Sequence, residues 1–343
     1  MTTRQRRGVR QSSGAFEGGG SWPTCGCDRS SDAPYFISCI FPMLIKRASP
    51  RLARAPEVTL LPLLESVSES ELQQWVRRLA VPRHFVFEPE ENEGVGLWIG
   101  AQLQSWGYRV QMQGHWRNVV ALPPRKSGPL ALVGAHYDSV GGCPGADDNA
   151  SAVAAMLGCA KACSRVKPLP PLAFVAFNRE EDNLLGSRDF VEWLASQRNV
   201  EIGEAHILEM VGFASDERGT QRIPPGLPVK VPDTGNFLGL LANRASHAAL
   251  DRLLSNASTY LPDFPVIGLR VTLGLEKYFP VLLRSDHAPF WAVKKPAIMW
   301  TDTSEFRNPF YHQPGDKPET LNYAFLRKVT QLLVAALLQS GRK

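Results

Sequence analysis

Apolar positions along the chain recur at two spacings, and these predict an alternation of strands and helices. Short apolar runs predict strands at Tyr108–Met112, Asn118–Leu122, Leu130–Ala135, Leu172–Asn178, Ala205–Val211 and Pro296–Trp300. Longer segments predict helices at Glu69–Leu79, Val95–Trp106, Asn149–Ser164, Leu184–Ser196, Asn236–Leu254 and Leu321–Leu338. This order predicts an α/β fold, a three-layer sandwich with a mostly parallel central sheet flanked by helices.

Side chains that can do chemistry follow three of the predicted strands. His136 comes directly after one buried run, and Glu209 lies near the end of another. Glu180 and Glu181 follow a third. Ligands bind beyond the carboxyl ends of parallel strands, so we expect these groups to converge at one edge of the sheet. Imidazole and carboxylate suit zinc, and one Glu of the adjacent pair can bind metal while the other moves protons.

Composition narrows the classes of partner. The 343 residues are 44% hydrophobic and 21% charged, as in an ordinary globular protein. The net charge of +5 comes from residues 1–55, which hold nine Lys or Arg against three Asp or Glu; the remainder holds 29 against 30. We therefore expect no nucleic-acid partner. No apolar run approaches the roughly 20 residues of a membrane helix, so we expect no transmembrane segment.

The first 55 residues differ from the rest. The glycines Gly18–Gly20, the serine pairs and the scattered arginines favour a disordered extension before a folded domain at 56–343. Met43 is an alternative start. No clear signal peptide is present, and the six cysteines show no regular spacing, which slightly favours a cytoplasmic protein.

Four motifs in a fixed order carry a family resemblance. They are His136-Tyr137-Asp138, Gly145-Ala146-Asp147-Asp148-Asn149-Ala150-Ser151, Glu180-Glu181 with Gly186-Ser187, and Asn308-Pro309-Phe310-Tyr311-His312. Together they resemble the M28 family of zinc peptidases, which includes bacterial aminopeptidases and glutamate carboxypeptidases. The resemblance runs from about Glu69 to Leu338. It implies a metal-dependent exopeptidase and favours an aminopeptidase that acts on peptide or aminoacyl substrates.

The resemblance also implies a site with two zinc ions. His136 would bind one ion and His312 the other, with Asp148 bridging both. Glu181 would complete the ligands of one metal and Glu209 those of the other. The family more often has Asp where this chain has Glu209, whose extra methylene moves the carboxylate. The alternative is that Glu209 points to solvent and the site holds a single metal.

Two residues receive catalytic roles from the resemblance. Glu180 would be the general base, taking a proton from a zinc-bound water acidified to a pKa of about 7 and passing it to the leaving amine. The alternative for Glu180-Glu181 is a solvated loop. The Tyr311 phenol would donate to the oxyanion, although a packed loop aromatic is an equally simple interpretation.

Three further residues are expected to support ligands or to line the pocket. Asp138 can accept the free N–H of His136 and fix its tautomer, unless it only caps a turn. Asp147 competes with Asp148 for the bridge; the resemblance favours Asp148, followed by a cis peptide, and leaves Asp147 as a helix cap. His287 is assigned to the pocket because His312 fills the metal role.

Other readings of the same motifs stay open. A glutaminyl cyclase-like acyltransferase would hold one zinc, a carboxypeptidase would share the fold with the opposite polarity, and a non-catalytic binding module would lack ligands or the base. Asp302 and Glu305 could meet an amino terminus, whereas Arg284 and Arg307 could meet a carboxylate. Surface salt bridges would explain all four equally well.

Overall fold

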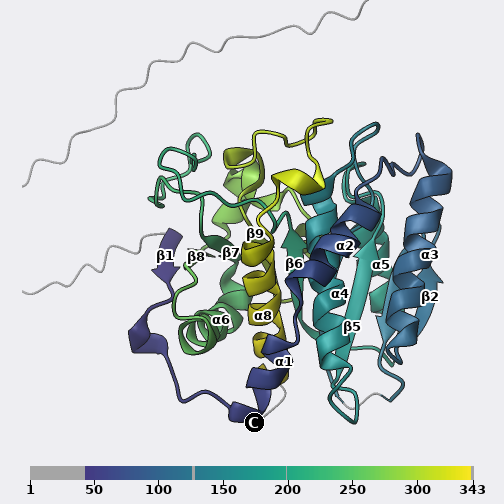
Figure 1. Cartoon of the computed structure of the whole chain (residues 1–343), viewed down its shortest axis with the longest axis horizontal. Helices are drawn as coiled ribbons and strands as arrows, with labels where there is room; N and C mark the ends of the chain where they lie inside the picture. Colours follow the sequence, from purple (N-terminus) through teal and green to yellow (C-terminus); the bar gives the residue numbers. More distant parts are fainter. Residues whose placement is uncertain (1–42, 126–127, 198, 341–343) are drawn as a thin grey trace, which may run out of the picture. The chain divides into compact units, whose positions relative to one another are not determined.

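The computed structural model describes residues 43–125, 128–197 and 199–340, and these build one nine-stranded sheet. Its order is β1-β8-β7-β9-β6-β4-β5-β3-β2. The strands are β1 Met43–Arg47, β2 Arg109–Gln113, β3 Asn118–Leu122, β4 Leu130–His136, β5 Leu172–Phe177, β6 Ile202–Glu209, β7 Leu238–Ala242, β8 Val266–Val271 and β9 Ala297–Thr301. Figure 1 shows β1 and β8 at one edge of the sheet.

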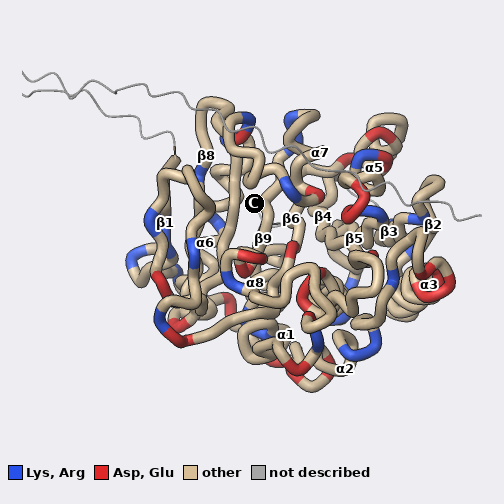
Figure 2. Tube along the Cα trace, turned by 90° about the horizontal axis from the view of Figure 1, so that it is seen from above, with Lys and Arg blue, Asp and Glu red and all other residues tan. Residues whose placement is uncertain are grey.

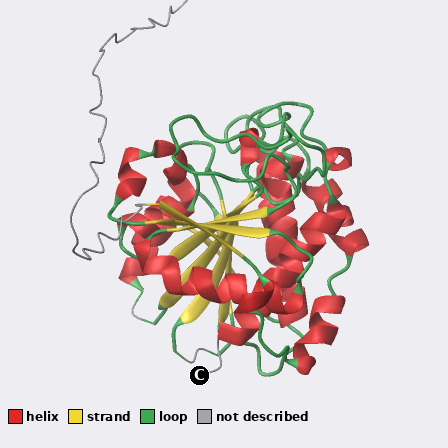
Figure 3. Cartoon of the chain, turned by 90° about the vertical axis from the view of Figure 1, so that its left-hand side faces the viewer, coloured by secondary structure: helices red, strands yellow, loops and turns green. Residues whose placement is uncertain are grey.

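The sheet is parallel at its centre and mixed overall. Strands β9, β6, β4 and β5 run parallel to one another, as do β7 and β8, whereas the other neighbouring pairs are antiparallel. The predicted α/β fold is confirmed, and the parallel pairs lie at the centre of the sheet and between β7 and β8. In this central part, the carboxyl ends of β4, β5 and β6 lie on the same side of the sheet, at the ends of the strands. Figure 3 shows many of the loops gathered at one end of the strands.

Helices cover both faces of the sheet (Figures 1 and 3). One hydrophobic core contains residues of α1 Leu61–Glu65, α2 Glu69–Leu79, α3 Pro89–Ser105, α4 Ala152–Cys163, α6 His247–Tyr260 and α8 Tyr323–Ser340. The core on the other face contains residues of α5 Leu185–Ser196 and α7 His287–Ala292. The second core also takes in apolar residues of a loop within 227–229 and of the 3₁₀ helices Leu275–Tyr278 and Pro280–Leu283, so short elements cover part of that face.

The predicted elements agree best where the periodicity is strong. Helix α2 and strand β3 match their predicted bounds. The predicted helix Asn236–Leu254 is wrong, because its first half is strand β7 and the helix begins only at His247. The apolar run of β7 is followed by Asn243 and a short 3₁₀ turn, and the sequence pattern alone does not show that break.

The predicted boundary of the N-terminal extension also needs correction. Residues 1–42 lie outside the described part of the chain, so the extension itself stays a prediction. Residues 43–47, however, form β1, which pairs antiparallel with β8, and Met43 is buried. The backbone N–H groups of Ser49 and Arg54 donate to hydroxyls of α6, at Ser258 and Thr259. The folded domain therefore includes residues assigned to the extension.

Charge is spread over this fold. Figure 2 shows Lys and Arg interspersed with Asp and Glu along the described trace. Within the described residues, no helix has both the length and the apolar character needed to cross a membrane.

Candidate metal centre

His136 is the last residue of β4 and is almost completely buried. Its Nδ1 atom lies 3.4 Å from Asp138 Oδ1. Its Nε2 atom lies 3.2 Å from Asp148 Oδ1 and 3.5 Å from Glu209 Oε1. Neither ring nitrogen has a hydrogen-bond partner among the described residues. Buried polar atoms are nearly always satisfied, so this imidazole is placed to bind a group that is not part of the protein chain.

Asp148 lies in the turn that precedes α4. Gly145 starts this turn with φ of 57°, and a Cβ there would lie 2.1 Å from the Asp148 carbonyl oxygen, so only glycine fits. The side chain of Asn149 ties the turn to β6 by donating to the Leu208 carbonyl and accepting from the Met210 N–H. The Asp148–Asn149 peptide is cis, as the family resemblance implied.

Two sets of ligand atoms share Asp148. His136, Asp148 and Glu209 form one set, and its ligand atoms lie within 4.8 Å of one another. Asp148, Glu181 and His312 form the other within the same limit. His312 Nε2 lies 3.2 Å from Asp148 Oδ2 and 3.2 Å from Glu181 Oε2. The two oxygens of Asp148 thus face different imidazoles, the arrangement that a bridge between two ions requires.

The charges of these side chains fit a divalent cation. Burial and then the Asp148 charge raise the pKa of Glu181 to about 7. Burial and the neighbouring Glu209 and Glu181 raise the pKa of Glu180 well above its usual value, despite His136. Burial lowers the pKa of His312, but hydrogen bonds to Asp148 and Glu181 raise it to about 10. Such crowding of buried carboxylates is relieved by a bound cation, and imidazole with carboxylate is the donor set that zinc accepts.

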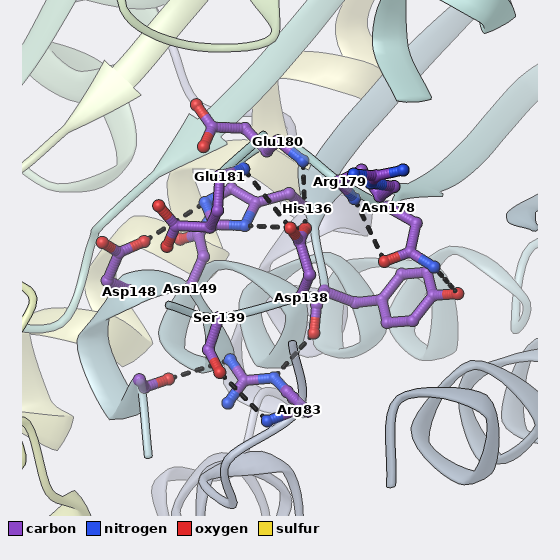
Figure 4. Close-up of polar contacts among 12 residues, drawn as sticks. Arg83, His136, Asp138, Ser139, Asp148, Asn149, Asn178, Arg179, Glu180 and Glu181 are labelled. Carbon is purple, nitrogen blue, oxygen red and sulfur yellow. Dashed lines mark hydrogen bonds and ion pairs between the residues drawn. The ribbon is translucent and has the colours of Figure 1, made fainter. Parts of the chain in front are cut away.

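Glu180 is held beside this centre but is not one of the ligands in the two sets that share Asp148. It follows β5, and its backbone N–H donates to Asp138 Oδ1 at 3.2 Å, while that of Glu181 donates to Oδ2 at 3.3 Å. Figure 4 shows Glu181 beside Asp148 and the Glu180 carboxylate pointing another way. Asp138 therefore orients His136 and both glutamates at once.

The backbone near the centre is strained. Arg179, Met210 and His312 adopt left-handed φ values of 57°, 49° and 58°. Arg179 immediately precedes Glu180, Met210 immediately follows Glu209, and His312 itself belongs to the centre. Such conformations cost of order 1–3 kcal/mol each and cluster at functional sites.

Comparison with known proteins shows the family of the chain. The sequence model of Peptidase family M28 matches residues 118–259. The uncharacterised protein YfbL of Escherichia coli (strain K12) is 33% identical over 254 residues, covering 69% of this chain and 76% of that protein. The chain belongs to peptidase family M28.

Other similar proteins differ more in length or in sequence. Aminopeptidase YwaD of Bacillus subtilis (strain 168) is 28% identical over 218 residues, which are 62% of this M28 peptidase and 42% of YwaD. The Legionella pneumophila LapA aminopeptidase shares the fold with a TM-score of 0.66 at 18% identity, covering 85% of this chain and 79% of that one. Porphyromonas gingivalis glutaminyl cyclase also shares it, with a TM-score of 0.59 at 18% identity, covering 80% and 98%.

The two other supporting residues of this M28 peptidase lie away from the ligand atoms. Asp147 points away from the two ligand sets, and its carboxylate accepts from the Gly212 N–H at 2.9 Å and from Asn308 Nδ2 at 2.8 Å. It thereby anchors the loop that carries His312. His287 is buried, with Nε2 2.9 Å from the Leu282 carbonyl oxygen. Burial lowers its pKa to about 4, and it does not line the cavity at the centre.

The neighbours of His287 are the residues that face the centre. The Ser285 hydroxyl donates to Glu209 Oε2 at 2.7 Å. Both carboxylate oxygens of Asp286 are buried with no hydrogen-bond partner among the described residues. Burial raises the pKa of Asp286 to about 7, against the opposing effect of His136. The sequence predicted a pocket role for His287 itself, whereas Ser285 contacts Glu209 and His287 does not line the cavity.

Two residues that the sequence analysis missed hold the Asp148 turn. Arg83 is fully buried and donates to the carbonyl oxygens of Tyr137 at 2.6 Å, of Gly145 at 3.0 Å and of Pro144. Asp316 accepts from the backbone N–H groups of Asp147 and Asp148 at 2.9 and 3.0 Å. Neither lies in a motif, and a lone charged residue in a loop gives no periodic signal.

Tyr311 lines the cavity beside His312. The two rings stack with centroids 3.7 Å apart, and the phenol oxygen accepts from Arg284 at 2.9 Å, which leaves its own hydrogen free to donate. Arg284 also pairs with Glu305. Asp302 and Arg307, by contrast, are buried and do not line the cavity. Asp302 accepts from the Phe213 and Ser304 N–H groups, so neither residue is placed to meet a substrate terminus.

Proposed function

We propose that the chain is a zinc-dependent aminopeptidase whose site takes two zinc ions. The observation that carries the proposal is the sharing of Asp148 between two sets of three ligands. His136 and Glu209 would hold one ion, Glu181 and His312 the other, and Asp148 would bridge them. Two ions set close together clamp the attacking and developing oxygens of a hydrolysis.

The residues around the ions then have distinct tasks. Bound zinc supplies a Lewis acid and a water whose pKa falls to about 7. The Glu180 carboxylate would take a proton from the attacking water and deliver it to the nitrogen of the leaving amine. Tyr311, with its oxygen accepting from Arg284, donates its hydroxyl hydrogen to the oxygen that becomes negative at the scissile carbonyl. Asp138 holds His136 and the backbone of both glutamates in register for these steps.

The choice of an aminopeptidase has support from relatives. YwaD, named an aminopeptidase, is 28% identical over 62% of this chain. A site for two ions also separates the proposal from a glutaminyl cyclase, for which the sequence analysis expects one zinc. The complete ligand set, with His136 in place, argues against a non-catalytic module of the same fold.

Metal counting joined to a substrate panel tests this function. The protein is stripped with a chelator and reloaded with zinc, and bound zinc is counted by mass spectrometry. The panel holds amino-acid amides, acyl-glutamate peptides and peptides with N-terminal Gln. We expect two zinc ions per chain and hydrolysis of the amides. One tight ion with cyclisation of the Gln peptides would instead assign the chain as a glutaminyl cyclase, and preference for acyl-glutamate would assign a carboxypeptidase.

Glu180→Gln tests the base. The amide cannot accept the proton, so kcat on the best amide should fall at least ~10²-fold, the scale of general acid–base catalysis. Zinc content should stay the same, because Glu180 is not a ligand in the two sets that share Asp148. Glu192→Gln, at an exposed position of α5, is the matched control and should keep wild-type kcat. Unchanged kcat in Glu180→Gln would remove Glu180 from the mechanism.

A further inference from the structure

A cavity opens at the metal centre and extends across the sheet towards its β1 edge. Asp148, Glu181, Glu209 and His312 line one end of it, and Ile45 of β1 lines it as well. Strands β9, β7 and β8 lie between β6, which carries Glu209, and β1. The cavity therefore reaches from the reacting centre to the edge of the sheet.

Two rows of paired residues make the floor of this cavity. Successive strand neighbours in the first row are Glu209, Thr301, Gly239 and Ile267. The second row lies two residues away from the first on the strands that they share. Its successive strand neighbours are Met299, Leu241, Leu269 and Ile45. Residues two apart on a strand share a face, so both rows lie on the same side of the sheet. Away from Glu209 and Thr301, this floor offers only apolar side chains and one glycine.

Away from the charged residues Arg222, Arg284 and Glu305, the roof of the cavity is apolar too. It comes from Leu227 and Val229 of a loop and from Val281 and Leu282 of the 3₁₀ helix Pro280–Leu283. Gly239 contributes no side chain to the middle of the floor, which leaves room above β7. The cavity thus continues away from the metal centre as an apolar channel, defined by the two floor rows and these four roof residues.

The channel is longer than an amino-acid side chain. Neighbouring strands lie about 4.8 Å apart, so three steps from Glu209 to Ile267 cover about 14 Å, and the fourth, to β1, makes about 19 Å. An extended chain advances roughly 1.2 Å per bond, so a leucine side chain reaches only about 4 Å. A linear chain of about 12 bonds would span the distance to Ile267.

The polar groups of the channel favour an aliphatic occupant over a peptide. A peptide would bring N–H and C=O groups that need partners, whereas the strands of the floor already pair with one another. The polar side chains near the metal end are satisfied within the protein. Gln221 donates to Thr303 at 2.8 Å, and Thr301 accepts from the Thr303 N–H at 2.9 Å.

We propose that this channel binds the long aliphatic acyl chain of an amide, and that the centre hydrolyses long-chain N-acyl amino acids. This activity rests on the proposed zinc hydrolase. Water adds its oxygen to the acyl carbonyl carbon and the C–N bond breaks. One proton of the water passes through Glu180 to the nitrogen, which leaves as the free amino acid, and the acyl chain leaves as a fatty acid.

Binding of linear alkyl hydroxamates, from two to sixteen carbons, tests the length of the channel without turnover. The hydroxamate head anchors on zinc, and the tail enters the channel of the zinc-loaded full-length protein. By calorimetry, Kd should fall about fourfold for each added methylene up to roughly 12 carbons, where the tail reaches Ile267, and more gently from there to β1. Levelling at four or five carbons would show an ordinary side-chain pocket and would overturn the proposal.

Variants of β1 place the far end of the channel. Ile45 faces the channel, whereas Leu44 is 46% exposed and points to the opposite face of the same strand. In Ile45→Trp the ratio of the Kd for four carbons to that for fourteen should fall at least tenfold, and in Leu44→Trp it should stay the same. In Leu269→Trp, one strand nearer the metal, the loss of affinity should begin at a shorter alkyl tail. Melting curves identify any variant that does not fold, and equal ratios in all folded variants would refute the assignment.

Turnover separates this inference from the proposed function. With zinc bound, kcat/KM for N-dodecanoyl amino acids should exceed that for the N-acetyl compounds at least 100-fold. If leucine amide is hydrolysed but the acyl series shows no rise with length, the inference fails and the aminopeptidase stands. If zinc-loaded protein hydrolyses no amide at all, the proposed function itself fails.

Discussion

At the scale of single residues, Glu209 shows how a longer carboxylate fits the centre. Its Oε1 atom lies 3.5 Å from His136 Nε2, and its Oε2 atom accepts from the Ser285 hydroxyl at 2.7 Å. The extra methylene, relative to the Asp found more often in the family, thus lets one side chain reach two partners. Ser285 fixes the orientation of the Glu209 carboxylate, which would otherwise be free to rotate.

Glu209→Asp should weaken one of the two zinc sites and spare the other. The shorter side chain cannot keep both partners, and loss of ligand support costs about 10- to 100-fold in metal affinity. Competition with a chromophoric chelator measures the two affinities in sequence. Glu201→Asp, at an exposed position just before β6, serves as control. If both affinities in Glu209→Asp equal those of the wild type, Glu209 is not a ligand.

His287 should make the zinc-free protein less stable in mild acid. Its pKa is about 4 in the folded protein and about 6.5 in the unfolded chain, so below pH 6.5 the unfolded state binds the extra proton. Stability is complete above pH 6.5, and up to about 3 kcal/mol is lost as the pH falls towards 4. His287→Gln, which can still donate to Leu282, should show a smaller loss between pH 7 and 5 in urea titrations. Equal slopes would rule out this role.

At the scale of elements, the turn before α4 is held from two directions. Arg83 donates to carbonyl oxygens at its start, and Asp316 accepts from N–H groups at Asp147 and Asp148. Asp316 also follows His312 by only four residues. The two loops that carry Asp148 and His312 are therefore joined by hydrogen bonds from backbone N–H groups to the Asp316 carboxylate.

Arg83→Met should loosen this turn and the zinc site with it. The carbonyls of Tyr137, Pro144 and Gly145 would lose their donor in a buried place, which costs roughly 1–3 kcal/mol for each unsatisfied group. We expect at least about 3 kcal/mol less stability by urea unfolding, together with weaker zinc binding. Arg83→Lys keeps the charge with fewer donors and should recover part of both. A Met variant as stable as the wild type would contradict the proposed clamp.

Much of this architecture follows from periodicity, and the rest depends on partners distant in sequence. The amphipathic spacing of Glu69–Leu79 and the buried run of Asn118–Leu122 were sufficient to place α2 and β3. Strand β7 was misread because its apolar run passes within four residues into a helix. The edge strand β1 has only one buried residue and gave no strand pattern of its own.

The site could be predicted from the sequence about as well as the fold. His136, Asp148, Glu181, Glu209 and His312 come together as the strand ends and motifs indicated, although their metal roles stay predictions. Ser285, Asp286, Arg83 and Asp316 were not predicted. Their contributions depend on contacts between residues 54 to 169 positions apart or on burial, neither of which leaves a local mark in the sequence.

At the scale of the whole molecule, the N-terminal edge of the domain belongs to the fold. A chain that starts at Phe41 keeps β1, whereas one that starts at Pro56 loses the strand and the burial of Met43. Burying one such side chain contributes about 1.5–3 kcal/mol, so the shorter chain should melt at least about 4 °C lower. The longer one should match the full-length protein by differential scanning calorimetry. Equal melting of both would mean that β1 adds nothing to stability.

Because strands make the floor of the channel, the length of the channel changes by whole strands. Each strand contributes one residue per row, so adding or removing an edge strand changes the length available by about 4.8 Å, or roughly four carbon atoms. Within the family, variation at the sheet margin would then shift chain-length preference in four-carbon increments and leave the catalytic machinery at β4, β5 and β6 untouched. Chain-length selectivity would thus be set at the β1 edge of the sheet, away from the residues that carry out the hydrolysis.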